Sequence, residues 1–299
     1  MKPILTKSTL NSTAVQELRN MIKKKIQPWQ AIQIFHAHVD PKNITAKKTR
    51  ASVNNLTEII SKRAKSCALV GNSGILLNSS CGDLIDASDL IVRMNLAKFG
   101  HEYSSDVGSK VTFMTINGEQ CKLLQACLRN DGKLANESSS EWLERNLTGK
   151  CGGVIDRLGL LKNDSVLWPA RGRRTYRMII DILPLLRKQF HLHFSVGINY
   201  VSLIGTAQRL WHFRNPSSGS SLLAPMTQLC DEISLFGFYP FYIDDYNRTI
   251  PHHYYEPEVK MNYKRNSHRM PNEYKFLLDL ENKHAIRIIN NCSTTNHFI

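Results

Sequence analysis

The chain has 299 residues, 42% of them hydrophobic, which is enough apolar material to bury a sizeable core and excludes a disordered chain. Its formal net charge of +14 favours an anionic partner: a nucleic acid, an anionic membrane surface, or an acidic small-molecule or glycan substrate. No stretch reaches the roughly 18 apolar residues of a membrane span, and the start lacks the apolar core of a signal peptide, so the sequence predicts a soluble protein.

Cysteine and asparagine usage bears on the compartment. The 7 cysteines show no CxxC or His-interleaved zinc spacing, so we expect no metal site, and their odd number leaves at least one thiol free or paired between chains. Numerous Asn-x-Ser/Thr sites favour a secretory origin, although an Asn- and Ser-rich chain produces some by chance. The acceptor asparagines are Asn11, Asn43, Asn55, Asn78, Asn136, Asn146, Asn163, Asn247 and Asn291.

Residues 1–63 differ in composition from the rest, because they are rich in Lys, Thr, Asn and Ser. We interpret them as a stem with one or two helices packed on the following domain. IKKKIQPWQAIQIF is the one amphipathic stretch, and TAKKTRASVNNLTEIISKRAK is typical of a basic helix or linker. Strand, loop and helix then alternate, so we assign residues 64–299 to a single domain.

This alternation predicts an α/β fold in which helices cover both faces of a mainly parallel sheet. Strands are expected at CALV, DLIVRMN, KVTFMTIN, SVLWPA, ISLFGFYPF and AIRIIN. Helices are expected at 119–129, 174–190, 198–212, 219–233 and 270–282.

Polar residues follow three of the predicted strands at their carboxyl ends. Because these ends meet at one edge of a parallel sheet, we expect the side chains to share one ligand pocket. They are Asn72 and Ser73 after the first strand, Arg93 and Asn95 at the end of the second, and Thr115 and Asn117 at the end of the third.

The GNSG turn is a candidate site for a nucleotide or sugar. Gly71 and Gly74 allow a tight turn and a close backbone approach, and the two residues between them offer hydrogen bonds without charge. An ordinary strand-to-helix turn favours the same residues, however, and no Gly-Lys-Ser/Thr follows as in a P-loop.

NPSSGSSLLAPMTQLCDEI is a second candidate anion site. Ser217 and Ser218 can cap a helix that begins near Gly219, and the free N–H groups of such a helix attract a phosphate. A plain Ser-capped helix is the commoner case. Two histidine-bearing stretches near the end, PHHYYEPE and NSHRMPNEYKFL, supply side chains suited to general base catalysis, although lone histidines are usually structural.

From about residue 64 to 293 the sequence resembles the animal sialyltransferases, and most of all the α-2,8-sialyltransferases. Residues 67–117 resemble the large sialyl motif and PSSGSSLLAPMTQLCDEISLFGFYPF the small one. HYYE at 253–256 resembles the third motif, and HRMPNE at 268–273 the very small His-x4-Glu motif. Cys81 in NSSCG points to the α-2,8 branch.

The resemblance implies a single Rossmann-like glycosyltransferase domain, a GT-A-like variant. It implies an inverting, metal-independent transfer of sialic acid from CMP-sialic acid to a glycan, forming an α-2,8 linkage onto a terminal sialic acid. Polymerising members carry a strongly basic segment before the small motif, which is weak here, so we expect mono- or oligosialylation.

The family resemblance also carries expectations about cell biology. Members are type II membrane proteins of the Golgi, so it implies a Golgi lumen location with an N-terminal anchor that is not in this chain. The expected partners are a sialylated glycoprotein or glycolipid acceptor and, in some members, a second copy as a homodimer.

Roles for individual residues follow from the motif matches. Asn72, Asn95, Ser217, Ser218 and Gly219 match positions that hold CMP, and Ser73 and Tyr239 are expected in the same donor site. His253 matches the histidine that supports the leaving phosphate, and His268 matches the catalytic base. The family pattern also implies the disulfides Cys67–Cys230 and Cys81–Cys292, and leaves Cys121, Cys127 and Cys151 unassigned.

Three residues depart from the family pattern: Met94 stands where α-2,8 members usually carry Cys, Tyr239 where Trp is common, and Ser218 where Thr is frequent. The alternative function is a catalytically silent glycan- or nucleotide-binding protein on the same fold, which the surviving histidines disfavour. A nucleic-acid-binding role is weaker still, because no recognition motif accompanies the charge.

Overall fold

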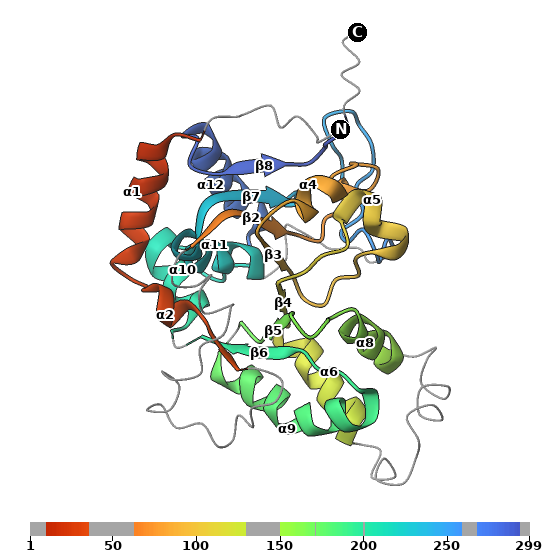
Figure 1. The fold of residues 1–299 in the computed structure, drawn as a ribbon. Helices are drawn as coiled ribbons and strands as arrows, with labels where there is room; N and C mark the ends of the chain where they lie inside the picture. Colours follow the sequence, from red (N-terminus) through yellow and green to blue (C-terminus); the bar gives the residue numbers. More distant parts are fainter. Residues whose placement is uncertain are drawn as a thin grey trace.

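The structure is a computed structural model that describes residues 10–35, 63–129, 150–170, 172–199, 201–258 and 268–293. An 8-stranded sheet in the order β1-β6-β5-β4-β3-β2-β7-β8 runs through the molecule (Figure 1). Neighbouring strands are parallel, except that β1 pairs antiparallel with β6. The strands are β1 (Gln33–Phe35), β2 (Ala64–Val70), β3 (Leu90–Arg93), β4 (Phe113–Thr115), β5 (Val166–Trp168), β6 (Ser195–Ile198), β7 (Cys230–Phe236) and β8 (Arg287–Ile289).

Helices cover both faces of this sheet, as predicted (Figure 1). One face carries α1 (Ser12–Lys23), α2 (Pro28–Ala31), α10 (Leu203–Trp211), α11 (Ser218–Leu229) and α12 (Met270–Asn282). The other carries α4 (Gly82–Asp86), α5 (Ser104–Val107), α6 (Gly118–Arg129), α8 (Lys150–Gly159) and α9 (Arg173–Phe190). Two short 3-10 turns, η3 (Gly74–Leu76) and η4 (His101–Tyr103), complete the described elements.

The sheet separates two hydrophobic cores, because successive side chains of a strand point to opposite faces. In β2, Ala68 and Val70 belong to the core under α6 and α9, whereas Cys67 and Leu69 belong to the core under α11 and α12. A strand buried on both faces is a continuous apolar run, which is why CALV was recognisable from the sequence.

All six predicted strands are present, and two more were missed, β1 and β6. The helix predicted over 198–212 begins only at Leu203, where the Ser202 hydroxyl caps it by accepting from the Gly205 N–H at 3.0 Å. The helix predicted over 219–233 ends at Leu229, because the chain passes directly into β7 and pairs with β2.

The described part of the predicted stem is continuous with the rest of the fold. Helix α1 lies along α11, and the Arg19 guanidinium, which is 8% exposed, donates to the carbonyl oxygens of Thr227 and Cys230 at 3.1 and 2.9 Å. Strand β1 is one of the two edge strands of the sheet. Residues 10–35 therefore share the sheet and core of the domain assigned to 64–299, while residues 36–62, with most of the predicted basic helix or linker, lie outside the described residues.

Three disulfides join distant segments. Cys67 pairs with Cys230 and Cys81 with Cys292, the two pairs that the resemblance implies. A third disulfide, Cys127–Cys151, ties the end of α6 to the start of α8.

The remaining cysteine, Cys121, is a buried free thiol, and burial raises its pKa to about 12. It is therefore inert at neutral pH. Among the described helices none is long and apolar enough to cross a bilayer.

Candidate active site

A cavity of about 590 Å³ opens at the carboxyl ends of the parallel strands. The strand order reverses between β2 and β7, since the chain adds strands on one side of β2 up to β6 and then on the other. Open α/β sheets bind ligands at such a reversal. Nine residues were expected to bind the donor or to act in catalysis, and all nine line this cavity: Asn72, Ser73, Asn95, Ser217, Ser218, Gly219, Tyr239, His253 and His268.

The GNSG turn is held against the end of β7 by close backbone packing. The Gly71 N–H donates to the Phe236 carbonyl at 2.7 Å, and a Cβ on Gly71 would lie 2.5 Å from the Gly237 oxygen. Gly237 has a φ of +68°, a conformation that glycine adopts without strain. Glycine is therefore required just after β2 and just after β7, because the two backbones pack too closely there for a side chain.

Asn72 links the large motif to the third motif. Its Nδ2 donates to the Met94 carbonyl at 3.2 Å and to the Tyr255 hydroxyl at 3.3 Å, and its carbonyl oxygen accepts from the Tyr254 N–H at 3.0 Å. The side-chain oxygen Oδ1 is buried and has no partner among the described residues. A buried acceptor left unpaired costs about 1–3 kcal/mol, so a turn of the Asn72 side chain that brings Oδ1 to a donor in the cavity would be favoured.

The neighbouring strand ends contribute backbone geometry as well as side chains. Asn95 adopts a left-handed φ of 56°, and its N–H donates to the Thr115 hydroxyl at 3.1 Å. Thr115 was also expected in the pocket, and this prediction is wrong, because Thr115 supports the cavity wall through Asn95 and does not line it. Asn117 does line the cavity, and its Oδ1 caps α6 by accepting from the Gln120 N–H at 2.9 Å.

Arg93 was expected in the pocket, and this prediction is wrong. Its side chain is 1% exposed and points into the core under α6 and α9, where Nε donates to the Lys110 carbonyl at 2.8 Å. The guanidinium lies over the Phe99 ring at 4.7 Å and 3.8 Å from Asp86 Oδ1. Burial lowers the pKa of Arg93 to about 10, so it remains a structural cation at neutral pH.

The start of α11 is fixed by a buried carboxylate from the very small motif. Both Glu273 oxygens accept from the Ser217 N–H at 3.1 Å, and the Ser220 hydroxyl donates to the same carboxylate. Ser217 in turn caps the helix by accepting from the Ser220 N–H at 3.2 Å. The N–H groups of Ser218 and Gly219 remain without an acceptor among the described residues, and they line the cavity with the positive end of the helix.

His253 is oriented by an acidic and an aromatic partner. Its Nδ1 lies 3.1 Å from Glu256 Oε2, and Glu256 Oε1 lies 3.4 Å from Arg157 Nη1. Because a carboxylate only accepts, Nδ1 carries the hydrogen of this bond. The other ring nitrogen, Nε2, takes no part in the contact with Glu256. The ring is stacked between those of His252, at 4.2 Å, and Tyr255, at 5.2 Å.

His252 is an additional histidine of the cavity wall that the motif matches did not single out. Burial, followed by the neighbouring His253, lowers the pKa of His252 to about 4, so it is neutral at physiological pH. Lys122 and Tyr274 also line the cavity and were missed. They sit on helices α6 and α12 within ordinary amphipathic patterns, so no local signal distinguished them.

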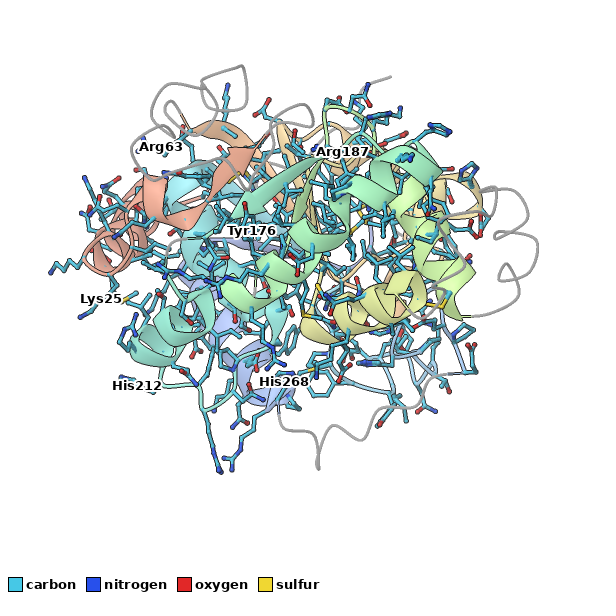
Figure 2. The ribbon with its side chains drawn as sticks, turned by 90° about the horizontal axis from the view of Figure 1, so that it is seen from below. Lys25, Arg63, Tyr176, Arg187, His212 and His268 are labelled. Atoms are coloured by element: carbon cyan, nitrogen blue, oxygen red, sulfur yellow. A yellow bond between two sulfur atoms is a disulfide. The ribbon has the colours of Figure 1, made fainter. Side chains whose placement is uncertain are left out.

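His268 lies at the start of α12, next to which Figure 2 labels it. Its Nδ1 is 2.9 Å from the Asn215 carbonyl oxygen. Since a carbonyl only accepts, Nδ1 is the protonated nitrogen, and Nε2 is the basic nitrogen of the neutral ring. The described residues contain no group of His, Cys, Asp and Glu that could hold a metal ion.

The family model for glycosyltransferase family 29 (sialyltransferase) matches residues 10–285. The chain belongs to this sialyltransferase family. It is similar to the alpha-N-acetylneuraminide alpha-2,8-sialyltransferases of Bos taurus and Xenopus laevis, with 29% and 27% identity over 235 residues. These matches cover 75% of the chain and 58% of each relative, so the chain spans little more than half the length of these relatives.

Two solved structures of a mammalian sialyltransferase also align with the chain. One is in complex with Gal-beta-1-3GalNAc-ortho-nitrophenol. Its alignment has a TM-score of 0.47 and covers 97% of this chain and 91% of the chain in that structure. The other has a TM-score of 0.49 and covers 97% and 90%. Sequence identity is 20% in both alignments.

In this member of the sialyltransferase family, the four sialyl motifs meet in one cavity. Asn72 comes from the large motif, Ser217 from the small motif, His253 from the third and His268 from the very small one. The motif contacts are direct, since Asn72 bonds to the third motif and Glu273 of the very small motif bonds to the small one. The arrangement offers uncharged donors, two free helix N–H groups and two histidines to an anionic ligand.

Proposed function

We propose that the protein is a sialyltransferase that transfers sialic acid from CMP-sialic acid to a glycan acceptor with inversion at the anomeric carbon. The observation that carries this proposal is that residues from four separate motifs, including both histidines, line a single cavity. Membership of the sialyltransferase family supports the reaction class.

The donor nucleotide occupies the part of the cavity made by the GNSG turn and the start of α11. Asn72 Oδ1, which is buried and has no described partner, accepts a hydrogen bond from the nucleotide, and Asn95 lines the same wall. The unpaired N–H groups of Ser218 and Gly219 bind the phosphate, since a helix N-terminus carries partial positive charge. Ser217 fixes that helix start, and Ser73 and Tyr239 complete the wall.

The two histidines have separate roles: His268 accepts a proton, and His253 stabilises the negative charge of the leaving phosphate. His268 Nε2 takes the proton of the acceptor hydroxyl while that oxygen forms a bond to the anomeric carbon of sialic acid. The bond from this carbon to the phosphate oxygen of CMP breaks at the same time, and its electron pair leaves with CMP. His253 carries a hydrogen on both ring nitrogens, so it bonds Glu256 through Nδ1 and donates from Nε2 to the departing phosphate.

The finer assignments belong to the same proposal. The names of the similar bovine and frog enzymes support an α-2,8 linkage onto a terminal sialic acid. The weakly basic segment before the small motif supports the addition of one or a few sialic acids. Three disulfides favour an oxidising secretory compartment such as the Golgi lumen. The acceptor asparagines of the described Asn-x-Ser/Thr sites are all exposed, as glycosylation there requires: Asn11, Asn78, Asn163, Asn247 and Asn291.

The test is incubation of the protein with CMP-sialic acid and a panel of acceptors that includes lactose, sialyllactose and a sialylated glycoprotein, with and without EDTA. We expect a disialylated product from sialyllactose, an α-2,8 linkage by NMR, and a rate that EDTA does not change. Binding of CMP without any transfer would contradict the proposal and favour a silent binding protein. A product from lactose alone would contradict the α-2,8 assignment.

A further inference from the structure

One short segment collects almost all of the exposed large hydrophobic side chains. Apart from Met21 on α1, those of the described residues are Phe241, Tyr242, Ile243 and Tyr246, with exposed fractions of 36%, 43%, 52% and 82%. We call residues 239–246 the aromatic segment. It overlaps the end of the small motif at residues 239–241 and continues beyond it, and a cluster of exposed apolar side chains at one place marks an interaction site.

The aromatic segment is ordered by its own hydrogen bonds. The Asp244 carboxylate accepts from the backbone N–H groups of Tyr246 and Arg248 at 3.0 and 2.8 Å, and it pairs with the Arg248 guanidinium at 2.6 Å. The guanidinium lies over the Tyr246 ring at 5.3 Å. The rings are therefore presented on a fixed turn, which lowers the entropy cost of binding a partner.

The same segment is continuous with the cavity. Tyr239 and Tyr274 both line the cavity, and Phe241 packs edge-on against each of them, with ring centroids 5.2 and 5.5 Å apart. The Tyr239 hydroxyl donates to the Ile243 carbonyl at 3.0 Å, which ties the outer turn to the cavity wall. A molecule that reaches out of the cavity over Tyr239 and Tyr274 meets this exposed surface next.

The chemistry of the segment fits sugar rings better than a membrane surface. Aromatic faces stack on the apolar C–H faces of hexopyranoses, and carboxylates accept from their hydroxyls. Asp245 is exposed among these rings, whereas the Asp244 carboxylate is 5% exposed and is paired with Arg248. The exposed carboxylate of Asp245 disfavours an anionic bilayer surface and also a charged sugar, so neutral sugar units are the best match.

We propose that the aromatic segment binds the neutral sugar units of the acceptor that carry the reacting terminal residue. This inference rests on the proposed function and extends it, because it makes the enzyme selective for acceptors in which neutral hexoses adjoin the reacting residue. It assigns acceptor selectivity to Tyr242 and Tyr246, outside the four motifs.

The test compares the parent protein with the double variant Tyr242→Ser/Tyr246→Ser, and uses Met21→Ser as a matched control, because Met21 is 42% exposed on α1. Two probes are used in the presence of CMP: sialyllactose, which has two neutral sugars, and methyl sialoside, which has none. Their affinities are measured by NMR titration, so the result does not depend on turnover. All proteins also carry Asn247→Gln, because a glycan on this sequon would cover Tyr246.

We expect the double variant to bind sialyllactose about tenfold more weakly, as expected for the loss of two ring contacts, and to bind methyl sialoside and CMP as the parent does. Met21→Ser should change none of these affinities. Equal affinity of parent and double variant for sialyllactose, or no measurable binding by the parent, would overturn the inference.

Two further outcomes separate the alternatives. If the double variant keeps its affinity for sialyllactose but loses binding to phosphatidylcholine–phosphatidylserine vesicles, the segment contacts a membrane and the inference is wrong. If the parent shows no transfer but the affinity contrast for sialyllactose is present, the proposed function fails while the sugar-binding segment stands.

Discussion

Replacing Asn72 by alanine is the sharpest test of the donor site, because this residue lines the cavity and its side chain also makes hydrogen bonds within the protein. Its Nδ2 makes two hydrogen bonds within the protein, to the Met94 carbonyl and the Tyr255 hydroxyl, whereas its buried Oδ1 has no described partner. Each lost internal bond costs about 0.5–1.5 kcal/mol, so Asn72→Ala should reduce the free energy of unfolding by roughly 1–3 kcal/mol and still fold.

The loss of Oδ1 removes an unpaired buried acceptor from the free protein, which offsets part of that loss of stability, and it removes one hydrogen bond from the liganded state. One hydrogen bond to the nucleotide is worth about 1–1.5 kcal/mol, which corresponds to a roughly tenfold rise in the Kd for CMP. Calorimetric titration with CMP measures this, and thermal unfolding measures the stability change separately.

Two controls separate the roles of the Asn72 atoms. Tyr255→Phe removes a partner of Nδ2 outside the cavity and should leave the CMP affinity within about twofold, and Asn20→Ala on the exposed face of α1 should change neither quantity. An unchanged CMP affinity in a folded Asn72→Ala protein would refute the placement of the nucleotide at the GNSG turn.

Three further predictions follow from the same geometry. His253→Ala should lower turnover and also raise the Kd for CMP, because its partner is the leaving phosphate; loss of turnover with unchanged CMP affinity would contradict that role. Loss of the Cys81–Cys292 disulfide, with a sequence separation of 211, should lower the free energy of unfolding by about 5 kcal/mol in the chain-entropy model, and loss of Cys127–Cys151, with a separation of 24, by about 3 kcal/mol. Denaturant unfolding of the two double Cys→Ala variants measures both losses, and a larger loss for Cys127–Cys151 would contradict the model. The pKa of His252 is lower in the folded state than in the unfolded state, so the unfolded chain binds the proton first as pH falls. Stability is therefore complete above about pH 6.5 and declines toward pH 4, by about 1 kcal/mol between pH 7 and 5 after allowing for partial exposure, and His252→Phe should lack this decline in urea titrations at the two pH values.

The predicted site residues came together because they lie at points where the chain changes direction. Gly71 marks the end of a continuously apolar strand, and Ser217 follows a proline and precedes an apolar helix, so local pattern located both. That both belong to one cavity followed from parallel pairing, which places strand ends at one edge of the sheet. The roles of the individual residues came from the motif resemblance and remain predictions until they are measured.

Arg93 shows where pattern reasoning fails. It ends its strand as Val70 ends β2, but alternation directs its side chain into the core under α6 and α9, and it does not line the cavity. The sequence around Arg93 does not indicate which way its side chain points, because its partners in the core, Lys110 and Asp86, come from other segments of the chain.

The missed strands have a different cause. β6 has four residues with a glycine at the third position, and β1 has three residues at the sheet edge, so neither shows a period long enough to recognise. The pairing of Cys127 with Cys151 was equally hidden, because two of three unassigned cysteines can pair in several ways and only the packing of α6 against α8 brings these two together.

The most direct test of the central claim is the rate of sialic acid transfer by His268→Ala, measured together with its affinity for CMP. A positioned general base contributes about 100- to 10,000-fold, so turnover with CMP-sialic acid and sialyllactose should fall by that order while the Kd for CMP stays near that of the parent. Near-normal turnover in His268→Ala would contradict the account, because the cavity would then transfer sialic acid without the base that its geometry provides.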